Sequence, residues 1–89
     1  MRIDFMTMEK CRRELKYAKD SLQKGYELFT QGDFSNAMFY INSSSTAYEW
    51  VYKVGEVYND EQIISLASAG ILKVKEIEDE INSNLEVER

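Results

Sequence analysis

The sequence predicts an all-α protein, an antiparallel up-down-up bundle of three long helices over about residues 7–30, 34–58 and 61–84. Proline is absent and glycine occurs only four times in 89 residues, which favours long, uninterrupted helices. Apolar side chains recur at alternating spacings of three and four, as on one face of a helix. Two short polar connections, Gly32-Asp33 and Asn59-Asp60, divide the chain into three segments. Connections this short force successive helices to run antiparallel.

The first helix is expected to begin after Thr7, whose hydroxyl can cap the free N–H groups of a first turn. Gly25 costs about 1 kcal/mol relative to alanine inside a helix. We therefore expect it to permit close approach of the second helix and to receive an aromatic side chain from it. Gly32 can take the left-handed conformation that ends a helix. The apolar seam of this helix comprises Met8, Cys11, Leu15, Ala18, Leu22, Gly25 and Phe29.

The second helix is the most apolar segment, and we expect it to lie at the centre of the bundle. Asp33 is its expected N-cap. Residues 34–58 hold seven of the eleven aromatic side chains, and their only acids and bases are Glu49, Lys53 and Glu56. Apolar positions cover well over half of its circumference, whereas a surface helix shows one stripe. Its main seam comprises Phe34, Ala37, Ile41, Ser44, Tyr48, Val51 and Gly55.

The third helix follows Asn59-Asp60, either of which can cap it. Its last turns are acidic, which opposes the helix macrodipole, so we expect fraying after Asn84. Residues 1–89 form one domain in this interpretation, with 1–6 and 85–89 as frayed ends. The residues expected to point inward are Ile64, Ala67, Ile71, Val74, Ile77, Ile81 and Leu85. The side chains expected to be nearly fully buried and in mutual contact are Leu15, Leu22, Ile41, Tyr48, Ile71 and Val74.

Length and charge limit the class of protein. A chain of 89 residues suffices for one domain with one core. Its net charge of −5 argues against general nucleic-acid binding, which relies on a basic face. The single cysteine cannot form an internal disulfide, in keeping with a reducing cytoplasm. No apolar run reaches the roughly 18 residues of a membrane span, and residues 1–8 lack a signal-peptide core. We expect a cytoplasmic protein that does not contact membranes.

The sequence offers no evident catalytic chemistry. Histidine is absent, which removes the commonest general base, the usual zinc ligand and every Ser-His or Cys-His pair. Gly32 is followed by Asp33 and Phe34, and no phosphate-binding glycine motif is present. Cys11 falls on the seam of the first helix, where a buried small side chain is expected. We therefore expect no enzyme activity, no cofactor and no metal site.

Two charged clusters leave other functions open. Glu76, Asp79 and Glu80 share one helix face and could hold Mg²⁺ in a metal-dependent hydrolase. The facing helices offer few partner carboxylates, so we favour a solvated surface. The basic residues near the start of the chain could bind an anion or RNA, although a solvated surface is again the favoured interpretation. They are Lys10, Arg12, Arg13, Lys16 and Lys19.

The first hairpin resembles a known family. The run from Gly32 to Ala37 (GDFSNA), followed by Ala47, Glu49, Lys53 and Gly55, is similar to the GDYxNAL…W.D.xxRLG pattern of an archaeal family. That family is named only as a domain of unknown function, number three-five-seven. The similarity covers residues 15–58 and departs from the pattern at Ala47, where an aromatic is common. The resemblance implies a three-helix bundle of archaeal origin with no assigned catalytic residues.

The same hairpin is similar to one tetratricopeptide unit and to a microtubule-interacting-and-transport domain. The small and aromatic residues that carry this likeness are Ala18, Gly25, Tyr26, Gly32, Asp33, Phe34, Ala37 and Ala47. One hairpin excludes a repeat array. This resemblance implies an alternative function, the binding of a peptide or amphipathic helix in a groove between helices.

Our principal interpretation is a non-catalytic module for protein–protein interaction or self-association. Helix spacing places Phe39, Trp50 and Val57 together, opposite the main seam of the second helix, with Val54 beside them. Exposed apolar patches of this kind mark contact sites. We expect this aromatic edge to bind a protein partner or a second copy of the chain in a homodimer.

Overall fold

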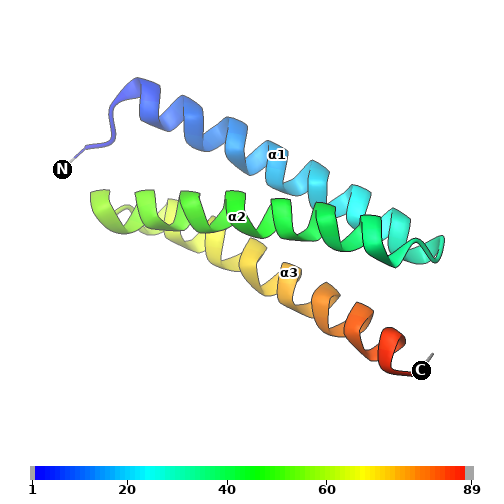
Figure 1. Cartoon of the computed structure of the whole chain (residues 1–89). Helices are drawn as coiled ribbons and strands as arrows, with labels where there is room; N and C mark the ends of the chain where they lie inside the picture. Colours follow the sequence, from blue (N-terminus) through cyan, green and yellow to red (C-terminus); the bar gives the residue numbers. More distant parts are fainter. Residues whose placement is uncertain (1, 88–89) are drawn as a thin grey trace.

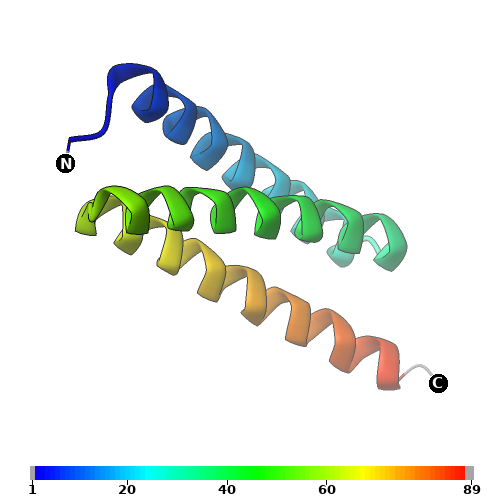
Figure 2. The same cartoon turned by 60° about the vertical axis from the view of Figure 1, so that its left-hand side comes forward.

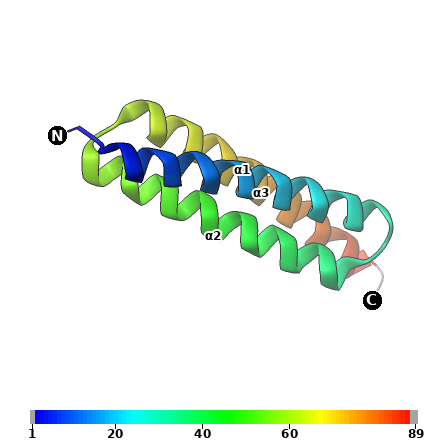
Figure 3. The same cartoon turned by 90° about the horizontal axis from the view of Figure 1, so that it is seen from above.

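The computed structural model describes the backbone of residues 2–87 and the side chains of residues 2–84. Three helices make up this part of the chain: α1 (Phe5–Thr30), α2 (Phe34–Tyr58) and α3 (Glu61–Val87). They run up, down and up, with α2 between α1 and α3 (Figures 1 and 2). Seen from above, all three run lengthwise in an elongated body of 51 × 17 × 13 Å (Figure 3). The predicted three-helix bundle is confirmed.

The central place of α2 determines where the core lies. Both α1 and α3 pack along α2, and they touch each other at few points. One cluster of buried side chains, around Leu22, Ile41, Tyr48 and Val74, fills the half of the molecule that contains the α1–α2 turn. A second cluster, around Cys11, Val51, Ile63 and Ala67, fills the half that contains the α2–α3 turn. Because α1 and α3 meet so little, one side of α2 is left open between them.

The first turn of α1 differs from our prediction. Asp4, and not Thr7, is the N-cap, and α1 begins at Phe5. The Asp4 carboxylate accepts hydrogen bonds from the Thr7 amide and the Thr7 hydroxyl, both at 2.8 Å. The hydroxyl of Tyr58 also donates to it, at 3.5 Å, which joins the start of α1 to the end of α2. Thr7 is therefore the third residue of the helix, and its own amide is the one that is capped.

Acidification should release this cap. The hydrogen bond from the Thr7 amide, followed by that from its hydroxyl, lowers the pKa of Asp4 from its ordinary value of 3.8. A carboxyl whose folded pKa is depressed stabilises the fold above its unfolded pKa and loses that contribution as the pH falls through the folded pKa. The amide proton shift of Thr7, followed by NMR, should titrate below pH 3.8. Asp4→Asn should abolish that titration, whereas a midpoint at or above the ordinary value would contradict the cap.

The two turns between helices lie at the positions that the sequence predicted. Gly32 takes a φ of 84°, and its amide and that of Asp33 close the end of α1 on Phe29 and Leu28. Asp33 then caps α2 by accepting from the Asn36 amide. In the second turn Asn59 takes the left-handed conformation, with a φ of 54°. Asp60, rather than Asn59, caps α3, accepting from the Ile63 amide at 3.1 Å.

The predicted core is largely confirmed. Leu22, Ile41, Tyr48 and Val74 are all less than 10% exposed. Leu15 and Ile71 are only partly buried and flank the first cluster, so their predicted full burial is wrong. Leu15 stays partly open because it lines the space between α1 and α3.

Elsewhere on the seams the differences are small. In the first turn of α3 the buried side chain is Ile63, and the predicted Ile64 is only partly buried. The helix extends to Val87, beyond the predicted end at residue 84. The predicted inward position of Leu85, and the acidic side chains of Glu86 and Glu88, lie outside the residues whose side chains are described.

Close approach of α1 and α2 occurs at Gly25, as predicted, but the side chain that packs against this glycine is not aromatic. A Cβ at Gly25 would lie 2.7 Å from Cγ1 of Ile41 and 3.1 Å from the carbonyl oxygen of Ala37. Two turns away, the buried Ser44 hydroxyl donates to the Ala18 carbonyl at 2.7 Å. These two contacts fix the register of α1 against α2. The glycine that receives an aromatic ring is Gly70 on α3, against Tyr48.

Candidate functional site

A groove runs along the molecule between α1 and α3, with α2 as its floor. Its cavity volume is about 730 Å³, and most of the surface that lines it is apolar. Leu15 and Leu22 form the α1 wall, and Leu66 and Ile77 form the α3 wall. Leu66 is 50% exposed and Tyr26, at the other end of the groove, is 42% exposed. Large apolar side chains therefore remain accessible at both ends.

The floor of the groove is Tyr48, and Gly70 gives it room. Tyr48 extends from α2, and a Cβ at Gly70 would collide with Cε1, Cζ and Cδ1 of its ring. The absence of a side chain at Gly70 thus lets the ring pass against the α3 backbone. Tyr48 is 4% exposed, yet it is one of the residues that line the groove. Only the edge of this side chain meets the open space.

The hydroxyl of Tyr48 has no hydrogen-bond partner among the described residues. Burial of the ring raises the pKa of Tyr48 above its ordinary value of 10.0, so the hydroxyl remains protonated and able to donate. Because no enclosed polar atom of the described side chains lacks a partner, this hydroxyl keeps some exposed surface, and Tyr48 is one of the residues that line the groove.

Charged side chains form the rims of the groove in two groups. Lys19 on α1 and Lys73 on α3 line it, as do Glu76 and Glu80 farther along α3. None of these four forms a salt bridge with another described residue. The groove therefore combines apolar walls with a basic pair and an acidic pair of free side chains.

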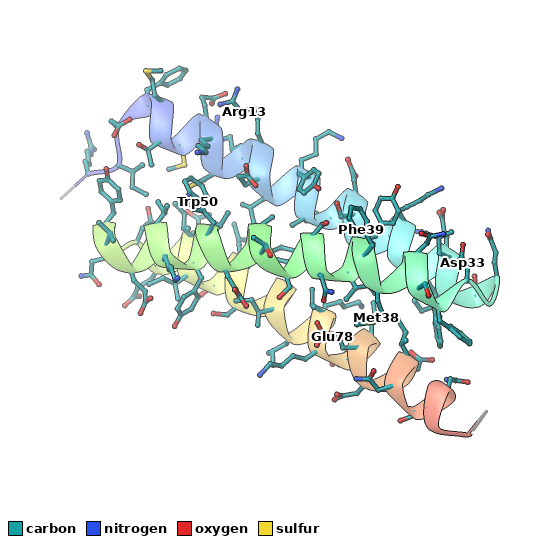
Figure 4. The ribbon with its side chains drawn as sticks, in the orientation of Figure 1. Arg13, Asp33, Met38, Phe39, Trp50 and Glu78 are labelled. Carbon is teal, nitrogen blue, oxygen red and sulfur yellow. The ribbon has the colours of Figure 1, made fainter. Side chains whose placement is uncertain are left out.

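The predicted aromatic edge lies on a different side of the molecule. Phe39 and Val57 are strongly exposed, at 65% and 69%. Trp50 and Val54 are partly buried and pack on the second core cluster. Trp50 points from α2 toward α1 (Figure 4), where Lys10 lies over its ring at 4.7 Å from the centroid. α1 thus covers part of Trp50, and a contact role for these four residues stays a prediction.

The charged clusters are spread over several sides. Glu76 and Glu80 line the groove, whereas Asp79 is exposed away from it. Within the described residues, no three His, Cys, Asp or Glu side chains come together in a way that could hold a metal ion. In the basic cluster, Arg12 pairs with Glu9 and Lys16 with Asp20. Arg13 points away from α2 (Figure 4).

Cys11 is buried in the second cluster, as predicted, at 1% exposure. Desolvation, followed by the charges of Asp60 and Glu14, raises the pKa of its thiol. A thiol with a raised pKa is less readily ionised, and the thiolate is the reactive form.

Comparison with family models, curated proteins and solved structures finds no match to this chain. The resemblance of the first hairpin to the archaeal family, and to single tetratricopeptide or transport-domain hairpins, therefore stays a prediction. Within the described residues no helix is long and apolar enough to cross a membrane.

The sequence suggested a groove between helices only through a resemblance, and it did not locate the groove or name the residues that line it. Leu66 and Tyr26 fall outside the predicted seams, and Gly70 was not assigned a role. A signal was present, since Gly70 is the only glycine in the continuous helix α3. It lies one turn from Leu66, which is large and exposed. A glycine inside a helix commonly marks close approach of another group.

Proposed function

We propose that this protein is a non-catalytic interaction module that binds one amphipathic helix of a partner protein in the groove between α1 and α3. The observation that carries the proposal is the open apolar groove with Tyr48 as its floor. A helix laid there would contact α1, α2 and α3 together and complete a four-helix bundle. Recognition of an amphipathic helix by an apolar groove is a recurrent mode of peptide binding.

The dimensions of the groove suit a short helix. Along α3 it extends from Leu66 to Glu80. At 1.5 Å per residue this is roughly 21 Å, the length of a helix of about 14 residues. Such a helix would place apolar side chains at i, i+4, i+7 and i+11 against the groove. Isolated helices of this length are marginal in water, so ordering of the partner would accompany binding.

A separate partner suits the groove better than a helix of a second copy. The outer surface of α1 carries the Arg12–Glu9 and Lys16–Asp20 salt bridges, at 2.8 and 3.1 Å. Such a charged surface cannot fill an apolar groove without burying its ions. The exposed edge of α2 lies on another side of the molecule, so inserting it into a neighbour's groove would be a head-to-tail contact. Contacts of that kind give rings or open chains, and they lack the self-complementary surface of a twofold dimer.

Two leucines of α3 provide a matched test. Leu66 lines the groove, whereas Leu72, which is 63% exposed, does not. Labelled 15-residue amphipathic peptides, with leucines at i, i+4, i+7 and i+11 and one glutamate flanking that stripe, are titrated by fluorescence anisotropy. Leu66→Asp should weaken binding more than about tenfold, because it places a carboxylate in the apolar wall and 1.4 kcal/mol corresponds to tenfold. Leu72→Asp should change the Kd less than about twofold.

Circular dichroism of both variants provides the folding control, because both leucines are half exposed or more and neither belongs to the buried clusters. Equal weakening by the two substitutions would remove the groove from the contact. Failure of the whole peptide panel to bind wild-type protein would contradict the proposed function itself.

Self-association through the aromatic edge is the second candidate. It is favoured by the exposure of Phe39 and Val57 on one face of α2. Light scattering of the protein alone separates the two functions, because groove binding predicts a monomer. A dimer that Phe39→Asp converts to folded monomers would favour self-association.

A further inference from the structure

We infer that the groove specifically binds an acidic side chain of the partner helix. This side chain would lie between Lys19 and Lys73, above the hydroxyl of Tyr48. The inference rests on the proposed function and names the polar feature by which one amphipathic helix is preferred to another. It combines two free ammonium groups on opposite walls with one unpartnered hydroxyl donor on the floor.

Helix register places these three groups within about one turn of one another along the groove. Ser44 of α2 meets Ala18 of α1, and Tyr48, one turn farther along α2, meets Gly70 of α3. Because α2 and α3 are antiparallel, the level of Ser44 on α3 is one turn beyond Gly70, at about residue 74. Lys19 and Lys73 are therefore neighbours across the groove, about one turn from the point where Tyr48 reaches the α3 backbone.

The chain itself does not neutralise this basic pair. Neither lysine forms a salt bridge with a described residue, and both are exposed. The carboxylates of the groove, Glu76 and Glu80, follow Lys73 on α3 by three and seven residues, and neither forms a salt bridge with Lys73 or Lys19. A carboxylate between the lysines would accept from both ammonium groups and from the tyrosine hydroxyl. Hydrogen bonds with an ionised partner are stronger than neutral ones.

An acidic group also suits this position better than a neutral one. Two lysines facing each other repel, and docking an apolar helix between them would remove water from both. A carboxylate offsets both the repulsion between the lysines and the loss of their hydration, whereas a glutamine offsets neither in full. The raised pKa of Tyr48 keeps its hydroxyl a donor in the neutral pH range, which an anion requires.

The test compares two peptides that have leucines at the same positions. One carries a glutamate beside the leucine stripe, and the other carries a glutamine at that position. Wild-type protein should bind the glutamate peptide about tenfold more tightly, which corresponds to about 1.4 kcal/mol. The preference should shrink to about threefold with Lys73→Gln or Lys19→Gln and vanish in the double variant. Lys75→Gln makes the same charge change on α3 at an exposed position outside the groove, and it should leave the tenfold preference intact.

The outcomes separate the inference from the proposed function. If both peptides bind wild-type protein equally well and Leu66→Asp still weakens them, the groove binds helices but reads no acidic side chain, and the inference is overturned. If Lys75→Gln reduces the preference as much as Lys73→Gln, the effect is one of net charge, which also overturns it. If neither peptide binds, the proposed function fails first.

Discussion

Ile41→Ala is expected to lower the free energy of unfolding by about 2–5 kcal/mol, the range for large-to-small substitutions in a core. Ile41 is 0% exposed and belongs to the larger buried cluster. Its Cγ1 fills the space beside Gly25 in which α1 and α2 approach most closely. Removing it leaves a cavity that these two helix backbones cannot easily collapse to fill. For a domain of this size such a loss is a large share of the whole stability.

Urea unfolding followed by circular dichroism measures this change. Phe39→Ala is the control, since Phe39 lies on the same helix two residues earlier and is 65% exposed. We expect it to change the free energy of unfolding by less than about 0.5 kcal/mol. A small loss for Ile41→Ala, comparable with that of Phe39→Ala, would show that α1 and α2 do not pack in this register.

Gly70→Ala should destabilise the protein although alanine is the better helix former. The substitution gains up to about 1 kcal/mol in helix propensity. Its methyl group would collide with Cε1, Cζ and Cδ1 of the Tyr48 ring, which is held between α2 and α3. Overpacking of this kind costs about 1–3 kcal/mol. We expect a net loss, and weaker binding of peptides in the groove, because Tyr48 must move.

A double-mutant cycle tests the cause. Tyr48→Leu removes the ring, so the methyl of Gly70→Ala can occupy part of the vacated space. The double variant should lose less stability than the sum of the single variants, with a coupling of about 0.5–3 kcal/mol. Ser65→Ala, at an exposed position of α3, controls for helix propensity alone. Strict additivity, or stabilisation by Gly70→Ala, would mean that Tyr48 does not lie against Gly70.

Local patterns were sufficient to predict the helices and their order. Gly32 and Asp33, and Asn59 and Asp60, mark the two turns through backbone preferences and capping that act within a few residues. The breadth of the apolar surface of α2 correctly predicted its central place. The predicted cap of α1, Thr7, was wrong, and Asp4 has that role. The two lie within one turn, and the structure uses both in a single set of hydrogen bonds.

The position of the groove could not be predicted, because it depends on how α1 and α3 each pack against α2 while leaving a space between them. Periodicity shows which side chains face inward, but it does not say which neighbour each one meets. Leu15 lies on the expected face, yet it borders open space because α3 packs against α2 instead of against α1. For the same reason, the prediction that Trp50 belongs to an exposed edge could not take account of Lys10, which reaches the Trp50 ring from α1.

The most direct test of groove binding is the map of amide and indole NMR shifts when the glutamate peptide is added to ¹⁵N-labelled protein. Binding in the groove predicts the largest changes at Gln23, Gly70 and Lys73, which line it. The indole N–H of Trp50 is a unique signal on the other side of the molecule and should stay in place. A large shift of the Trp50 indole and of Phe39, with Gly70 unmoved, would place the contact on the aromatic edge of α2 and contradict the groove.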